Sequence, residues 1–127
     1  KVNMSRFAIL RHTEHPTSKD HYDIVIEKIP GLKMDSEKIV KFETTSVLTK
    51  PNIKIKYMGL IGKKYLQYEG IVDGNRGSVE KVDLGDCEFV GNNSVKFSGK
   101  ILNGIYSFKG AGGEFINILE SSVLCKE

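Results

Sequence analysis

All three histidines of the chain fall within a ten-residue stretch, and an aspartate follows directly. They are His12, His15 and His21, and Asp23 lies two residues after the last. Two imidazoles and one carboxylate, with the remaining coordination positions open to water, suit a catalytic divalent metal such as manganese, iron or zinc. This donor set favours hydrolysis or oxygen chemistry over a structural metal site.

The alternation of side chains along a strand decides which of these residues can meet. In a strand over residues 21–28, His21 and Asp23 share one face, which could line a polar cavity. A strand over residues 6–11 ends just before His12, and the intervening loop can return the chain so that His12 meets His21. We therefore predict that His12, His21 and Asp23 converge on one cavity.

Other interpretations of the histidine cluster stay open. His15 is followed by Pro16, which favours a loop residue over a metal ligand. The whole cluster could also be a solvated loop whose histidines bind nothing.

A glycine-rich segment at residues 65–79 is a second candidate for chemistry. Arg76 lies between Asn75 and Gly77, where its guanidinium could grip a phosphate through two hydrogen bonds. The segment lacks the G-x-x-x-x-G-K-[ST] signature and the strand–loop–helix context of an NTPase phosphate loop. The alternative is a hairpin that carries an exposed arginine.

Lysines alternate with apolar and aromatic residues between residues 54 and 65. The lysines are Lys54, Lys56, Lys63 and Lys64. This pattern resembles a nucleic-acid-binding surface on a strand. Solvated lysines on an edge strand, which discourage aggregation, explain it equally well.

Composition limits the class of protein. The 127 residues are 39% apolar, which suffices for one core, so we expect residues 1–127 to form a single domain. Thirteen glycines and three prolines suit a compact fold rich in tight turns. The formal net charge of +3 is too small for wholesale phosphate-backbone binding but allows one local basic surface.

Two further features bear on the compartment. No apolar run approaches the ~20 residues that span a bilayer, and residues 1–5 lack the apolar region of a secretory signal. These features predict a soluble, cytoplasmic protein with no membrane partner. Cys87 and Cys125 are far apart and outside any C-x-x-C spacing, so we interpret both as reduced cysteines.

Alternation with a period of two runs along the whole chain, whereas helical spacing rarely lasts more than two turns. It predicts a mainly β fold, a single-domain antiparallel β-barrel with a polar cavity and at most short helices. The predicted strands are residues 6–11, 21–28, 39–48, 53–58, 65–71, 78–83, 87–90, 94–101, 105–109 and 115–119.

Turn signals divide these strands. Asn103-Gly104 predicts a tight hairpin, because Asn-Gly accepts positive φ at both central positions. Residues 91–93 predict another turn. A short helix is expected around residues 35–39, capped by Asp35 or Ser36. The tail, residues 120–127, is expected to be frayed or packed on an edge.

The order of motifs points to a known family. The segment 6–12 ends in His12, and His21-Tyr22-Asp23 opens the next predicted strand. This order resembles the start of the 3′-phosphoesterase domain of bacterial DNA ligase D and its stand-alone relatives. In that family a histidine ends the first strand and a His-aromatic-Asp triplet opens the second.

Later segments extend the resemblance over most of the chain. Residues 65–70, 74–79 and 83–85 look like the family's Tyr–Glu-Gly, glycine-rich and Asp-x-Gly blocks. Residues 95–104 are similar to its penultimate hairpin.

The resemblance implies a β-barrel with a polar cavity and a manganese-dependent site that trims 3′ ends. Such a site removes a terminal ribonucleoside and then the 3′-phosphate, leaving a 3′-hydroxyl for repair. His12, His21 and Asp23 match the family's metal ligands for Mn²⁺, or for another divalent ion such as Zn²⁺. Tyr65 matches a tyrosine that helps to hold the phosphate, and Tyr65 and Arg76 are the predicted catalytic residues. The implied partners are nucleic-acid 3′ ends and an ATP-dependent DNA ligase or repair polymerase.

The chain departs from the family pattern at two residues and in one loop. The family usually has an arginine two residues after the aspartate, where this chain has Val25, although shorter stand-alone relatives often lack it too. It usually has a histidine four residues before the tyrosine, where this chain has Ile61. The loop over residues 12–21 is also longer than the family's common spacing. Losing phosphate ligands or an acid-base group lowers the rate of catalysis, while the proposed metal ligands are retained.

Three functions follow from these observations. The first is a metal-dependent 3′-phosphoesterase-like protein that acts on nucleic-acid 3′ ends in DNA repair. The second is a non-catalytic relative that keeps the barrel and metal site and binds nucleic acid or a ligase. The third is a metal-dependent hydrolase of another small phosphorylated substrate.

Overall fold

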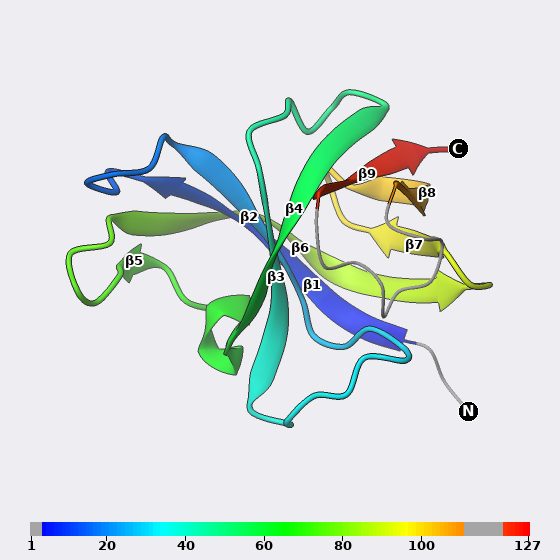
Figure 1. Cartoon of the computed structure of the whole chain (residues 1–127), viewed down its shortest axis with the longest axis horizontal. Coiled ribbons are helices and arrows are strands. Elements are labelled where there is room, and N and C mark those ends of the chain that lie inside the picture. The colour runs from blue at the N-terminus through cyan, green and yellow to red at the C-terminus, as the bar shows by residue number, and fades with distance from the viewer. Residues whose placement is uncertain (1–3, 111–120) are drawn as a thin grey trace.

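Eight antiparallel strands pair side by side and close into a barrel (Figure 1). Their order around the barrel is β1-β2-β3-β4-β9-β8-β7-β6, and β6 pairs in turn with β1. The computed structural model describes residues 4–110 and 121–127. The elements are β1 (Met4–Thr13), β2 (His21–Ile26), β3 (Lys38–Thr44), β4 (Asn52–Gly62), the 3₁₀ helix η1 (Lys63–Leu66), β5 (Gly70–Ile71), β6 (Ser78–Val90), β7 (Ser94–Ser98), β8 (Asn103–Lys109) and β9 (Ser121–Lys126).

The predicted mainly β barrel is therefore confirmed. The four-residue η1 is the one helix among the described residues, and it is far too short to span a bilayer. The short strand β5 pairs with β6 and lies outside the ring. In Figure 1 the start of β1 and the end of β9 lie on one side of the barrel, and the β1–β2 and β5–β6 connections lie together on the other.

The interior of the barrel is apolar. Alternate residues from all eight ring strands point inward and pack into one cluster, and removing them from water stabilises the closed ring. Its buried members are Phe7, Ile9, Ile24, Ile26, Ile29, Val40, Phe42, Leu48, Ile53, Ile55, Cys87, Phe89, Val95, Phe97, Leu102, Tyr106, Phe108 and Leu124.

A second, thinner apolar layer covers the outer face of β1, β2 and β3. There the residues of opposite parity pack against η1 and the chain that follows it. The buried members are Ala8, Val25, Ile39 and Leu66 in one cluster, and Leu10, Val72 and Val79 in another. The predicted polar cavity lies beside this outer layer and not inside the barrel.

Two predicted strands need correction. The predicted strands 78–83 and 87–90 are parts of one continuous strand, β6. The predicted strand 65–71 is wrong over most of its length, because η1 ends at Leu66 and only Gly70–Ile71 is extended. The consecutive residues Tyr65 and Leu66 both pack toward the same outer apolar cluster, which strict alternation along a strand does not allow. The predicted strand 115–119 lies outside the described residues.

The predicted Asn-Gly hairpin is also wrong. Asn103 and Gly104 already belong to β8, and the chain turns at residues 99–102. The buried carboxylate of Asp83 explains the shift, because it accepts hydrogen bonds from the backbone N–H groups of Lys100, Ile101 and Leu102 at 2.8–2.9 Å. Gly99 leaves room for that carboxylate, since a Cβ there would lie 2.6 Å from both Asp83 oxygens.

Two smaller predictions fail for related reasons. Residues 35–39 form a hydrogen-bonded turn and not a helix; the Asp35 carboxylate accepts the N–H of Glu37 at 2.7 Å, and β3 begins at Lys38. The tail is neither frayed nor on an edge, because β9 pairs with both β4 and β8. The predicted turn at residues 91–93 is confirmed.

Both cysteines are free, as predicted. Cys87 points into the barrel core, and its burial raises the pKa of the thiol to about 12. A thiol of that kind is unreactive near neutral pH.

We expect Asp83→Asn to lower the free energy of unfolding by about 3 kcal/mol, because the amide puts a donor against buried N–H groups that need an acceptor. Urea denaturation measures this. The matched control is Asp86→Asn, at an exposed position of the same strand. Equal stabilities of the two variants would show that the Asp83 carboxylate does not hold the turn.

Glu27 gives a test of acid stability. The Arg6 guanidinium, at 3.0–3.2 Å, lowers the pKa of the Glu27 carboxyl from 4.5 to about 2. A lowered folded-state pKa means that the pair stabilises the fold above pH 4.5 and that this contribution is lost as the pH falls toward 2. Because Arg6 is partly exposed, we expect Glu27→Gln to cost only about 1 kcal/mol at pH 7.

Denaturation of wild type and Glu27→Gln across pH 1.5–7 checks this expectation. The two stability curves should meet at the acid end. Glu80→Gln is the control, since Glu80 is exposed and forms no ion pair with a described residue. If the difference in unfolding free energy between wild type and Glu27→Gln stayed the same at the acid end, the Arg6–Glu27 ion pair would not be its cause.

Candidate metal centre

His12, His21 and Asp23 converge where β1 ends and β2 begins. His12 and His21 are direct partners in the antiparallel pairing of these strands, and their ring centroids lie 4.8 Å apart. Asp23 is two residues along β2 and shares the face of His21. One ligand atom from each of the three side chains lies within 4.8 Å of the others, as strand alternation predicted.

The outer nitrogen of His12 is held by a loop that is remote in sequence. His12 Nε2 lies 2.6 Å from the backbone carbonyl oxygen of Arg76, which can only accept a hydrogen bond. His12 Nδ1 lies 3.0 Å from Asp23 Oδ2, so both ring nitrogens face acceptors and a neutral ring can donate to only one of them. Donation from Nε2 to Arg76 would leave a lone pair on Nδ1 for a bound cation.

His21 repeats this arrangement with its nitrogens exchanged. Its Nδ1 donates to the carbonyl oxygen of Lys19 at 2.8 Å, which leaves the lone pair of a neutral ring on Nε2. His21 Nε2 lies 3.1 Å from Asp23 Oδ1. Although these two buried atoms are close, their directions do not form a hydrogen bond, and neither has another such partner among the described residues.

One nitrogen of each imidazole therefore faces the same buried carboxylate, while the other nitrogen faces a backbone carbonyl. When both rings donate to the carbonyls, their lone pairs point at Asp23 and repel it unless a cation lies among the three groups. Contact with Asp23 is the main cause that raises the pKa of His21, with burial opposing it, so the surroundings favour a cation. A histidine that binds a metal commonly donates its other N–H to a backbone carbonyl, as both rings do here. The donor set fits a divalent transition-metal ion.

Two charged residues on β3 complete the site, and the sequence analysis did not identify them. Glu43 Oε2 lies 3.6 Å from His21 Nε2, and Lys41 Nζ lies 3.8 Å from Asp23 Oδ1 and 3.5 Å from Glu43 Oε2. In the β2–β3 register, Glu43 is the partner of Asp23 and Lys41 is the partner of Val25. The sequence could have shown that Lys41 and Glu43 share one face of a strand, because they are two residues apart. Only the pairing of β2 with β3 shows that this face lies beside Asp23.

A cavity of about 120 Å³ lies over the cluster. One wall is polar and charged, and the other is apolar. Its lining residues are Leu10, His12, His15, Ser18, His21, Asp23, Lys41, Glu43, Ile61, Tyr65, Val72, Arg76 and Val79.

The two predicted catalytic residues reach this cavity in different ways. Tyr65, in η1, is half-buried on the cavity wall and packs edge-on against Tyr68. Arg76 contributes its backbone carbonyl to His12, while its exposed guanidinium donates from Nε to the carbonyl oxygen of Asp73 at 2.6 Å. The structure therefore places the Arg76 backbone, and not its charge, beside the cluster.

The remaining expectations are resolved by position. Ile61 lines the cavity, whereas Val25 is buried in the outer apolar cluster. His15 is a loop residue, as predicted, and its Nδ1 accepts the N–H groups of Thr17 and Ser18 at 3.2 Å.

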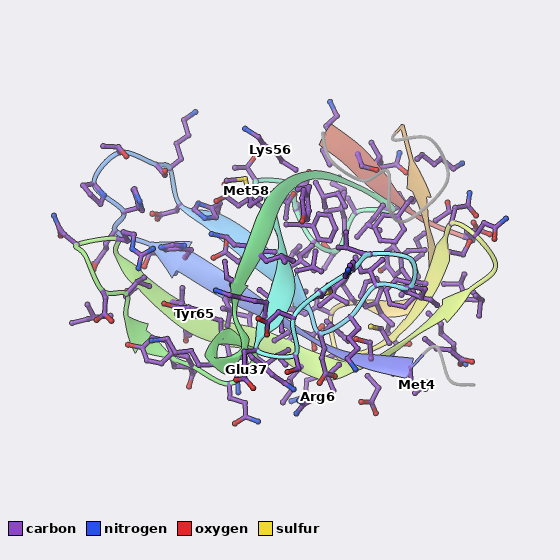
Figure 2. The ribbon with its side chains drawn as sticks, turned by 60° about the horizontal axis from the view of Figure 1, so that its bottom comes forward. Met4, Arg6, Glu37, Lys56, Met58 and Tyr65 are labelled. Atoms are coloured by element: carbon purple, nitrogen blue, oxygen red, sulfur yellow. The ribbon has the colours of Figure 1, made fainter. Side chains whose placement is uncertain are left out.

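The four lysines of residues 54–65 do not form one surface. Lys63 pairs with Glu27 at 3.4 Å, and Lys64 lies over the Tyr65 ring at 5.2 Å from its centroid. Lys54 and Lys56 belong to the other end of β4, as Figure 2 shows for Lys56 relative to Tyr65. Because β4 pairs with both β3 and β9, the edge-strand interpretation is wrong.

Comparison of the sequence with family models and with curated proteins found no match.

Gly77 lets the glycine-rich loop approach His12. Its φ is +81°, and a Cβ at this position would lie 2.1 Å from the carbonyl oxygen of Thr13 and 2.7 Å from the amide nitrogen of His15. A side chain would push residues 13–15 and 76–77 apart. The carbonyl of Arg76 would then move away from His12.

We expect Gly77→Ala to release His12 from this loop. In metal-free wild type, ¹⁵N NMR should detect a hydrogen-bonded proton between His12 Nε2 and the Arg76 carbonyl oxygen, and one between His21 Nδ1 and the Lys19 carbonyl oxygen. Gly77→Ala should expose the His12 Nε2–H to fast exchange and leave His21 unchanged. Its unfolding free energy should fall by more than the ~1–2 kcal/mol cost of positive φ alone.

Gly91→Ala separates strain from steric clash. Gly91 also has a positive φ, +68°, but a Cβ there meets nothing within 4 Å. Gly91→Ala should lose only the unfolding free energy that a positive φ costs, and its His12 NMR signal should match that of wild type. An identical His12 signal in wild type and Gly77→Ala would contradict the role of Gly77.

Proposed function

We propose that this protein is a metal-dependent 3′-phosphoesterase-like protein that acts on nucleic-acid 3′ ends in DNA repair. In this proposal His12, His21 and Asp23 hold a divalent ion such as Mn²⁺ or Zn²⁺. The observation that carries it is the orientation of the two imidazoles, each of which contacts a backbone carbonyl with one nitrogen and faces the Asp23 carboxylate with the other. The family resemblance of the motifs supplies the substrate class.

The residues around the cluster suit a phosphate ester. A divalent ion in this site would polarise a phosphoryl oxygen and lower the pKa of bound water. The Lys41 ammonium group, 3.8 Å from Asp23, can neutralise charge on the other phosphoryl oxygens. The Tyr65 hydroxyl can donate to them from the facing wall.

Lys41 also bears on the arginine that this chain lacks at Val25. Because Lys41 is the strand partner of Val25, a cation reaches the same part of the sheet from the neighbouring strand. Glu43, 3.5 Å from the ammonium group, holds it in place. In our proposal Lys41 takes over the contact with phosphate.

Ile61 should limit the rate. It places an apolar side chain on the cavity wall where the family has an imidazole. Loss of a general acid-base group costs roughly 10²–10⁴-fold in rate. Metal binding should remain, because Ile61 is not a proposed ligand.

We therefore expect wild-type protein to bind Mn²⁺ but to release phosphate slowly from a 3′-phosphorylated primer. Titration calorimetry measures binding, and phosphate release measures turnover. Ile61→His should raise turnover without changing Mn²⁺ affinity. His12→Ala and Asp23→Asn should abolish both binding and turnover, and chelation should stop the reaction.

His15→Ala is the control for the metal ligands, since His15 lies beside His12 but its Nδ1 is engaged by the backbone. It should bind Mn²⁺ like wild type. A 5′-phosphorylated primer controls for the position of the phosphate. Unchanged Mn²⁺ affinity in His12→Ala and Asp23→Asn would overturn the proposed site.

The non-catalytic alternative is favoured by one observation. The Arg76 guanidinium donates to Asp73 and does not face the cluster, so the predicted phosphate grip is not formed. A protein of this kind would bind Mn²⁺ and oligonucleotides. It would release no phosphate even as Ile61→His, whereas a weakened enzyme gains activity.

A further inference from the structure

A groove of about 560 Å³ borders the candidate metal centre. Ser18, His21 and Glu43 line both this groove and the smaller cavity over the cluster, so the two spaces adjoin. The groove extends from the cluster to residues of β4 and β9, among them Lys54, Lys56 and Val123. A ligand that reaches the cluster can therefore extend along the groove.

The groove is strongly basic. Lys19, Lys54, Lys56 and Lys109 line it, and Glu43 is the one acidic residue among its described lining residues. Its formal charge of +3 equals that of the whole chain. The modest net charge of the protein is thus concentrated beside the metal centre, where it would attract an anionic ligand.

The lysine side chains are free to bind that ligand. None of the four forms an ion pair with a described residue, whereas Lys41 and Lys63 are each paired with a carboxylate. Lys54 and Lys56 alternate with the buried Ile53 and Ile55, so both ammonium groups point outward. Their Cα atoms are spaced by about 6.7 Å along β4, which presents a row of charges.

We infer that this groove binds the sugar–phosphate backbone of a single nucleic-acid strand, with its 3′ end directed to the cavity at His12, His21 and Asp23. This inference rests on the proposed function. The groove volume lies within the ~300–1,000 Å³ of small-ligand sites, which is room for a few nucleotides of one strand. No described phenylalanine, tyrosine or tryptophan side chain lines it, so recognition is mainly by charge and is independent of base sequence.

The test is the salt dependence of binding, measured by fluorescence anisotropy on the full chain without divalent ions. The ligand is a 5′-labelled single-stranded oligonucleotide with a 3′-phosphate. Each phosphate contact contributes roughly 0.7 to the slope of log affinity against log salt for a single strand. The triple variant Lys54→Gln, Lys56→Gln, Lys109→Gln should therefore lower the slope by about 2.

A second triple variant controls for net charge. Lys33→Gln, Lys96→Gln and Lys100→Gln remove the same charge from exposed positions outside the groove. This variant should keep the wild-type slope to within about 0.7. Circular dichroism shows whether each variant is folded, and Lys56→Gln alone should lower the slope by about 0.7 if the triple variant is not.

Three outcomes would overturn the inference. One is an unchanged slope in the groove variants, and another is an equal loss in the control variant. The third is tighter binding of a duplex than of the single strand.

Failure of the proposed function gives a different pattern. Binding is measured without metal or turnover, so the salt slope reports on the groove whether or not the protein is an enzyme. If the protein released no phosphate but the groove variants lowered the salt slope, only the proposed enzyme activity would be refuted. If the protein released phosphate but the groove variants kept the wild-type slope, only the groove proposal would be refuted.

Discussion

The pairing of β1 with both β2 and β6 is the interaction on which the rest of the structure depends. β1 is hydrogen-bonded along its length to both neighbours, and this double pairing closes the ring. It gives every residue of β1 either an inward or an outward face. Phe7 and Ile9 enter the core, while Ala8, Leu10 and His12 face the outer layer. The same pairing brings the ends of β2 and β6 to His12.

The chemistry of the candidate metal centre is decided by backbone groups. The carbonyls of Lys19 and Arg76 each accept one imidazole proton, and they thereby direct the opposite nitrogens to Asp23. Both carbonyls belong to connections outside the strands, and Gly77 is what allows one of them to approach. The loops therefore contribute hydrogen-bond geometry, while the strands contribute the ligands.

Charge is divided between two adjoining spaces. In the smaller cavity, the acidic groups of Asp23 and Glu43 are paired with histidines and Lys41, an arrangement suited to a cation. In the groove next to it, lysines that form no ion pair with a described residue predominate, an arrangement suited to a polyanion. A nucleic-acid strand that ends in a 3′-phosphate could use both spaces. A cation in the cavity would bind the terminal phosphate, and the lysines of the groove would bind the phosphates of the backbone. Both proposals rest on this juxtaposition.

The sequence by itself determined the β class, most strands and the shared face of His21 and Asp23, because alternation depends only on neighbouring residues. The tertiary structure decided what depends on pairing between distant segments. Strand register brought Lys41 and Glu43 to Asp23. Contacts across the barrel likewise moved a turn from Asn103-Gly104 to the loop bound by Asp83, and oriented His12 through Arg76. Local propensity yields to such contacts because a buried carboxylate or carbonyl must be satisfied wherever the fold places it.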